Sequence, residues 1–186
     1  MKQLMIATCL LFSGTIYAQQ VGTGDNHCTI RIATGTKSYE FTSDSMQARL
    51  NESLERFEFK IPAGSVTSLR DPDDVFFFRR LMNGNDFITV NAALPDDQDG
   101  ELDLSRFKGT RTVNLAAEIG IGNRRFDEVV AFNGMLIGLD KNTMAFALNA
   151  SLDERALVPL NTGSEKIIEI QIAAKGDKII RLTTNQ

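Results

Sequence analysis

Few residues in this sequence are of the types that carry out acid–base, nucleophilic or metal chemistry. His27 is the single histidine, and no serine elbow, Walker loop or zinc-ligand spacing accompanies it. Cys28 lies on the apolar side of an alternating segment, which favours a small buried hydrophobe over a reactive thiol. Catalysis would require other polar side chains to converge on His27 in space. We therefore predict that the protein is not an enzyme and has no catalytic residue.

Two further segments resemble ligand-binding motifs only in composition. Residues 95–100 read Pro-Asp-Asp-Gln-Asp-Gly, but they lack the ligand spacing and terminal glutamate of an EF-hand calcium loop, so a solvated turn is favoured. Residues 120–123 read Gly-Ile-Gly-Asn and join two predicted strands, so no helix N-terminus is available there to bind a phosphate. The sequence therefore predicts no metal site and no cofactor.

Residues 1–18 have the anatomy of a secretory leader. Lys2 precedes an apolar run over residues 4–12, and small residues follow as far as Ala18, after which we expect cleavage. An acylated Cys9 is the less favoured alternative, because it lies inside the apolar run. The run is shorter than the ~20 residues that a membrane-spanning helix needs. We therefore expect an exported protein, periplasmic or secreted, without stable membrane insertion.

Composition limits what the remaining chain can be. Residues 19–186 are enough for one domain with its own core, and Cys28 is left there without a disulfide partner. Export without a disulfide favours a bacterial envelope compartment. The formal net charge of −4 makes nucleic acid and anionic membrane surfaces poor partners. No linker or internal repeat is visible, so we expect a single domain.

Apolar and polar residues alternate with a period of two through most of the chain. In residues 56–61 three apolar side chains alternate with three charged ones, which is typical of a strand with one wet face. Gly122-Asn123 and Gly176-Asp177 predict hairpin turns. The predicted strands are residues 28–33, 38–42, 46–50, 56–61, 87–94, 112–121, 126–139, 143–150, 166–175 and 178–183. In the last two, the predicted inward residues are Ile168, Ile170, Ile172, Ile180 and Leu182.

Residues 68–84 break this period and predict the one helix of the chain. Ser68 or Asp71 is suited to cap it, Pro72 to occupy its first turn, and Asn83-Gly84 to end it. Residues 76–78 are all phenylalanine, and they cannot all face one side because neighbouring helical residues lie about 100° apart. Ordinary packing over a barrel end is favoured, and contact of one ring with a ligand is the alternative.

The order of these elements resembles the YceI-like domain family. The resemblance rests on the leader, the strand Phe-Glu-Phe-Lys-Ile-Pro at residues 57–62, the helical excursion around residues 75–82, the strand 87–94 and the antiparallel run 110–150. It implies an extended antiparallel barrel similar to lipocalins, usually of eight strands. It also implies that the interior binds a long amphiphile such as a polyprenyl chain, an isoprenoid quinone or a fatty-acid derivative.

Physical chemistry leads to the same class of protein. A small closed barrel either fills its interior with side chains or holds one slender apolar ligand. Each buried methylene of a lipid tail contributes about 0.8 kcal/mol, so ten would contribute roughly 8 kcal/mol before ordering costs. The candidate lining residues are Phe57, Phe59, Phe76, Phe126, Phe132, Met135, Met144 and Phe146.

We therefore predict an all-β, antiparallel, lipocalin-like β-barrel of about eight or more strands with one short α-helix, formed by residues 19–186. Its predicted function is to sequester or carry an isoprenoid-like or fatty-acyl amphiphile, so its partner would be a polyisoprenoid, quinone or fatty-acyl molecule. The alternative is a filled barrel that binds no ligand and acts as an interaction or envelope-stress accessory module. An exposed apolar patch would favour that alternative.

Overall fold

A computed structural model describes residues 26–51, 53–94, 112–137, 143–160, 166–177 and 179–182, and most of these residues lie in β-strands. Every predicted strand is present, because alternation with one apolar face specifies both the strand period and the side that is buried. The strands are β1 His27–Thr34, β2 Ser38–Ser43, β3 Gln47–Asn51, β4 Arg56–Pro62, β5 Thr67–Ser68, β6 Phe87–Ala93, β7 Thr112–Ile121, β8 Arg124–Ile137, β9 Thr143–Asp153, β10 Ile167–Gly176 and β11 Ile180–Leu182. The helices are α1 Asp74–Met82 and α2 Glu154–Leu157, with 3-10 turns at Ala63–Ser65 and Val158–Leu160.

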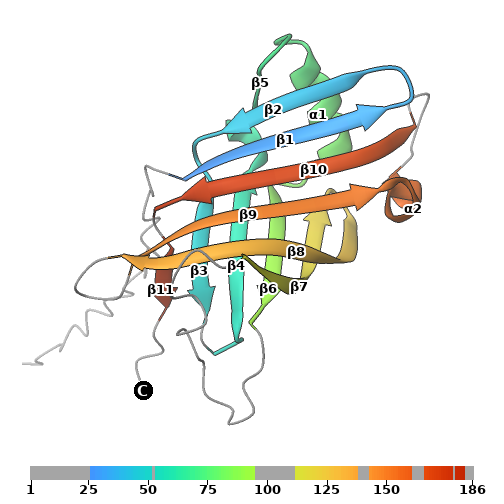
Figure 1. The fold of residues 1–186 in the computed structure, drawn as a ribbon. Coiled ribbons are helices and arrows are strands. Elements are labelled where there is room, and N and C mark those ends of the chain that lie inside the picture. Colours follow the sequence, from blue (N-terminus) through green and yellow to red (C-terminus); the bar gives the residue numbers. More distant parts are fainter. Residues whose placement is uncertain are drawn as a thin grey trace, which may run out of the picture.

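The strands form one sheet in the order β11-β3-β4-β6-β7-β8-β9-β10-β1-β2-β5. Two short connections join strands from opposite ends of this order: residues 44–46 join β2 to β3, and residues 63–66 join β4 to β5. Four residues span at most about 14 Å, so the sheet must curl until its two ends approach each other. Figure 1 shows the result, in which β1, β2, β9 and β10 cross steeply in front of β3, β4 and β6. This architecture is the predicted lipocalin-like barrel.

The core lies between these two crossing layers. On each of β1 to β4, buried residues alternate with partly or fully exposed ones, and the buried residues of all layers form one hydrophobic cluster. Phe41, Phe57, Phe59, Phe78 and Phe132 are the largest fully buried side chains. Burying one such ring stabilises the fold by about 1.5–3 kcal/mol, so the apolar faces supply the main driving force for closing the sheet.

Helix α1 covers one end of the barrel, as the break in the alternation predicted. Its N-cap is Asp73, which makes no side-chain cap hydrogen bond, so the prediction of Ser68 or Asp71 as the cap is wrong. Phe78 and Met82 are its buried apolar residues, and Asn83 ends it in the left-handed conformation with φ 47°. No helix in the described part of the chain is long and apolar enough to cross a membrane. The chain just after the C-terminal end of α1 contacts the turn between β7 and β8, where Asn85 Nδ2 donates a hydrogen bond of 2.6 Å to Asn123 Oδ1.

The chain after Gly176 differs from the prediction. The turn signal at Gly176-Asp177 predicted a hairpin, but β11 pairs in parallel with β3 instead of returning along β10. The reason is that both edges of β10 are already occupied, by β1 on one side and β9 on the other. A local turn signal does not show whether the neighbouring edge is free, and β3 was the strand with an edge to fill.

Three smaller features also differ from the prediction. Ile168 was predicted to face inward, but a register shift between Ala33 and Thr34 buries Ile167 and leaves Ile168 37% exposed. The two-residue strand β5 and helix α2 were not predicted. Helix α2 forms because the side chain of Asp153 accepts hydrogen bonds from the first backbone N–H groups of the turn, which is the usual N-cap interaction.

Substitution of Gly122 tests how tightly the β7–β8 turn packs against α1. Its φ is +57°, and a Cβ atom there would lie 2.7 Å from the carbonyl oxygen of Leu81. We expect Gly122→Ala to lower the free energy of unfolding by more than Gly84→Ala, because Gly84 shares the positive φ of +79° but has open space around it. Backbone strain alone costs about 1–3 kcal/mol. Equal losses in urea unfolding would show that the contact with α1 contributes nothing.

Candidate functional site

The candidate ligand-lining residues come from strands whose apolar faces line the interior. Phe57 and Phe59 lie on β4, and the rings of Phe132 on β8 and Phe146 on β9 reach the same region. The ring centroids of Phe57 and Phe132 are 4.5 Å apart, and those of Phe59 and Phe146 are 5.3 Å apart. Phe59 also lies 6.2 Å from Phe132. The structure therefore brings four of the predicted residues together. We call Phe57, Phe59, Phe132 and Phe146 the aromatic cluster.

A glycine makes room for this aromatic cluster. Gly134 lies within β8 and pairs with Phe146 on β9. A Cβ atom at Gly134 would lie 2.8 Å from both a ring carbon of Phe132 and the sulfur of Met144. Sequence reasoning missed this role, although an isolated glycine inside a strand is a known signal of close approach. Larger side chains at position 134 would push Phe132 or Met144 out of its present place.

The remaining predicted residues divide into three groups. Phe126 and Met144 are buried, at 6% and 3% exposure, on the inner faces of β8 and β9. The backbone of Met135 belongs to β8, but its side chain lies outside the described part of the structure. Phe76 is 61% exposed and faces away from the interior, and Phe78 is the fully buried ring of the three. Contact between Phe76 and a ligand inside the barrel would thus require the ligand to extend past α1.

A second aromatic group, which sequence reasoning did not predict, attaches α1 to β2. The rings of Tyr39 and Phe77 stack with centroids 4.1 Å apart and an interplanar angle of 3°. Phe41 and Phe78 lie 5.1 Å apart. Aromatic pairs of this kind contribute about 0.5–1.5 kcal/mol beyond burial, so α1 is held firmly against β2.

An ion pair adds to this attachment. Lys37 Nζ lies 2.5 Å from Oδ1 of Asp74 and 4.7 Å above the ring of Tyr39. Asp74 is 5% exposed, and within the described residues its Oδ2 atom has no hydrogen-bond partner. Lys37 is 47% exposed, so solvent weakens the pair, but breaking it would leave a buried carboxylate without a cation. The sequence could not show this contact, because the two residues are far apart in the chain.

His27 has polar neighbours, but they do not form an aligned proton relay. Its Nδ1 atom lies 2.6 Å from Oδ1 of Asp44, whose side chain is 82% exposed. The hydroxyl oxygen of Thr42 lies 3.5 Å from Nδ1 and 3.3 Å from Nε2, and it donates to the carbonyl oxygen of Cys28 at 3.2 Å. Because it is almost equidistant from both nitrogens, the hydroxyl is not directed at either one of them. This geometry does not support activation of Thr42 as a nucleophile.

Cys28 is completely buried on the inner face of β1. Burial raises the pKa of its thiol from 9.0 to about 12, because the thiolate would lose its hydration. A thiol that stays protonated at neutral pH is a poor nucleophile and a poor metal ligand. This environment agrees with the predicted role of Cys28 as a small buried hydrophobe.

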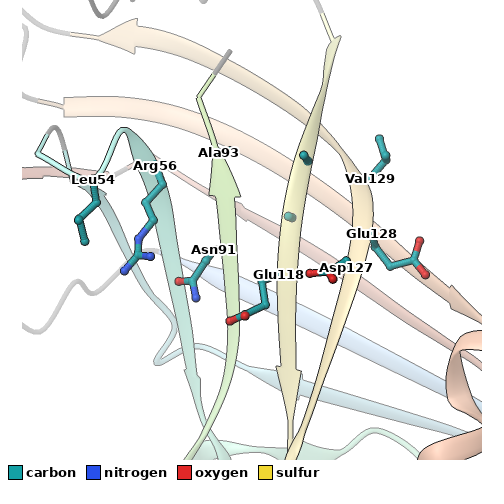
Figure 2. A pocket seen from close by; sticks show the side chains of 10 residues that line it. Leu54, Arg56, Asn91, Ala93, Glu118, Asp127, Glu128 and Val129 are labelled. Atoms are coloured by element: carbon teal, nitrogen blue, oxygen red, sulfur yellow. The ribbon is translucent and has the colours of Figure 1, made fainter. Parts of the chain in front are cut away.

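The outer face of the sheet carries an open depression of about 650 Å³ over β4, β6, β7 and β8. Figure 2 shows Arg56, Asn91 and Glu118 reaching into it from neighbouring strands. Glu118 pairs in register with Asp127, which places two carboxylates side by side, and Arg125 Nε lies 3.6 Å from Glu118. Like charges in directly opposed positions are destabilising. None of the predicted ligand-lining residues contributes to this surface.

A metal site is not formed by the described residues, since no group of three or more His, Cys, Asp or Glu side chains is suitably placed among them. The acidic turn at residues 95–100 lies outside the described residues. A second outer depression, of about 360 Å³, is lined by residues of β7 to β10 that include Asn114, Asn149 and Gln171.

Two solved structures share the fold of this chain. One is a polyisoprenoid binding domain from Saccharophagus degradans implicated in plant cell wall breakdown, with a TM-score of 0.50, 9% identity, and coverage of 82% of this chain and 94% of that chain. The other is BcnA from Burkholderia cenocepacia, with a TM-score of 0.51, 13% identity, and coverage of 80% and 94% respectively. A comparison with family models found no match, and a comparison with curated proteins found none either.

These similarities confirm the lipocalin-like fold that the resemblance to YceI-like domains implied. The chain has an all-β, antiparallel barrel architecture, to which β11 adds one parallel pairing. At identities of 9% and 13%, the similarity establishes the fold alone.

Substitution of Phe132 tests whether the aromatic cluster stabilises the barrel. Its side chain is fully buried and touches Phe57 and Phe59, so we expect Phe132→Ala to lower the free energy of unfolding by about 3–5 kcal/mol. Phe76→Ala is the matched control, since an exposed ring should change stability by no more than about 0.5 kcal/mol. Urea unfolding followed by circular dichroism measures both. Similar small losses would mean that the cluster is loosely packed.

Proposed function

We propose that the protein is an exported, non-enzymatic carrier that holds an isoprenoid-like or fatty-acyl amphiphile inside its barrel. The main support is that the chain shares its fold with a polyisoprenoid binding domain. A second support is the interior itself, where the described buried residues are apolar apart from Asn26, Thr34, Ser43 and Asp74. An apolar chain is the class of ligand that such a wall binds through burial of surface, without specific polar contacts.

A ligand that enters the aromatic cluster must separate rings that now contact one another, and this separation costs free energy. Separating a pair such as Phe57 and Phe132 would lose about 0.5–1.5 kcal/mol of ring–ring interaction. Burial of about two methylenes, at about 0.8 kcal/mol each, offsets one such loss. A tail of ten methylenes therefore offsets the loss of several ring contacts before ordering costs are counted. The flexible side chain of Met144, next to this cluster, suits a ligand of variable shape.

The same ring contacts favour a second candidate function. In the absence of a ligand, Phe57, Phe59, Phe132 and Phe146 already fill part of the interior with one another. A barrel filled in this way would act through its outer surface, as an interaction or envelope-stress accessory module. Leu54 and Val129, which are 54% and 62% exposed, border the depression of Figure 2 and would belong to such a surface.

Uptake of cis-parinaric acid, a fluorescent polyene fatty acid, distinguishes the two functions. We expect solvent-extracted, refolded protein to bind it with a Kd above the micromolar value that the full gain of about 8 kcal/mol would give, because ordering costs and displaced ring contacts reduce that gain. Unlabelled geranylgeraniol should displace it. Phe57→Leu should weaken binding several-fold because it removes a ring from the interior, whereas Phe76→Leu, on the exposed side of α1, should leave the Kd unchanged.

Native mass spectrometry of the untreated protein gives an independent measurement. A co-purifying apolar molecule that is lost on solvent extraction would support the carrier function. Absence of both a co-purifying molecule and parinaric acid uptake would overturn it and favour the filled barrel. A weakened Kd in Phe76→Leu instead of Phe57→Leu would show that the ligand extends past α1 to its exposed side.

Export is tested separately from binding. We expect expression of the full sequence in a Gram-negative host to yield periplasmic protein whose mass corresponds to a chain that begins at Gln19, because the leader ends at Ala18. Replacement of the apolar residues 4–12 by polar ones is the control and should keep the uncleaved chain inside the cell. An unprocessed chain in the wild-type periplasmic fraction would contradict the cleavage site.

A further inference from the structure

Two neighbouring rows of side chains on the outer face of the sheet line the depression of Figure 2. The first row crosses β6, β7 and β8 in register and consists of Asn91, Glu118 and Asp127. The second row lies two residues further along the same strands and consists of Ala93, Ala116 and Val129. One row is therefore polar and acidic, and the other is apolar and contains two small side chains.

The small side chains of the second row leave a hollow between longer ones. Ala93 and Ala116 are exposed, and their side chains end at Cβ. Leu54, beside β4, and Val129, on β8, border the same depression and are 54% and 62% exposed. Its volume of about 650 Å³ lies within the range of about 300–1,000 Å³ that is usual for ligand sites. The hollow is therefore large enough to accept an apolar side chain of a partner.

The charges of the depression favour a cationic partner. The described residues that line it include three carboxylates and one cation, Arg56, which already binds Glu58 at 2.9 Å. Figure 2 shows the side chains of Arg56, Asn91, Glu118 and Asp127 following one another across the strands. Glu118 is directly opposite Asp127, and carboxylates in such positions repel each other. A cation bound between them would remove this repulsion, and the formal net charge of −4 also attracts basic partners.

The distance between the two rows sets the spacing of the groups that fit. Residues two apart on a strand lie on the same face, about 6.6 Å from each other. The side chains of residues i and i+2 in an extended peptide share one side at the same spacing. An arginine at i can therefore reach Glu118 and Asp127 while an apolar side chain at i+2 enters the hollow at Ala116. Arginine suits this position because its planar guanidinium has five donors, enough for two carboxylates.

We propose that this depression docks an extended basic peptide segment of a partner protein, in which an arginine is followed two residues later by leucine or a similar apolar residue. The arginine binds Glu118 and Asp127, and the apolar side chain packs on Ala93 and Ala116. A small inorganic cation would use the acidic row alone and leave the apolar hollow unfilled. The inference goes beyond the proposed carrier function, because docking takes place outside the barrel and requires nothing of the interior.

Titration of isotope-labelled protein with two short peptides, followed by NMR, tests this docking site. The first peptide is acetylated and amidated Ser-Thr-Arg-Thr-Leu-Thr-Ser. The second has the same composition in the order Ser-Thr-Arg-Leu-Thr-Thr-Ser, which points the arginine and the leucine to opposite sides of an extended chain. We expect the first to bind about fivefold more tightly, because only there is the leucine partly buried as well. The backbone signals of Asn91, Ala116 and Asp127 should shift, and raised salt should weaken binding.

Variants of the protein separate the two rows. Glu118→Gln/Asp127→Asn should weaken binding of the first peptide about tenfold, the factor that two surface ion pairs can supply. The matched control Glu154→Gln/Asp177→Asn removes the same charge at exposed residues that do not line the depression, and it should leave the Kd unchanged. Ala116→Leu fills the hollow and should abolish the difference between the two peptides. All five positions are exposed, and urea unfolding confirms that each variant is folded.

Three results would overturn the inference. Equal affinity of the wild type for the two peptides would show attraction of charge without the apolar contact. Equal weakening in the two double variants would show a response to net charge and not to the depression. Binding of neither peptide would show that the depression is not a docking site for such segments. Uptake of cis-parinaric acid should be the same in Ala116→Leu and wild type, so failure of docking and failure of the carrier function are distinguished.

Discussion

The fold depends on one constraint: a sheet with a continuous apolar face must bury that face against itself. The connections at residues 44–46 and 63–66 join strands from opposite ends of the strand order, so the sheet has to curl. Curling brings the buried faces of the crossing layers together in a single core. The charged and polar residues of the same strands then necessarily lie outside, where they line the depression of Figure 2.

The two ends of this barrel differ in how they are closed. At one end, α1 is attached by stacked rings, a buried ion pair and a contact with the β7–β8 turn. Near the other end, the contacts seen among the described residues include the three-residue pairing of β11 with β3 and the hydrogen bond from Ile179 to Met144.

Period-two alternation predicted the strands and their buried faces well, because register and burial are coupled along a strand. Phe57, Phe59 and Phe132 are buried as their spacing indicated. Three consecutive phenylalanines carry no information on which ring faces the core, and packing against β2 selected Phe77 and Phe78. The room that Gly134 leaves for Phe132 and Met144 was equally out of reach, because it depends on which strand lies alongside.

The sequence by itself determined the fold class, the one apolar face of the sheet and the approximate position of α1, since each of these follows from periodicity and from turn residues over short distances. Only the tertiary structure decided the partner of β11, the pairing of Lys37 with Asp74 and the assembly of the aromatic cluster. Each of these joins residues that are distant in the chain. Their contact depends on which edges and faces remain unoccupied once the sheet has closed, and a local pattern carries no record of that.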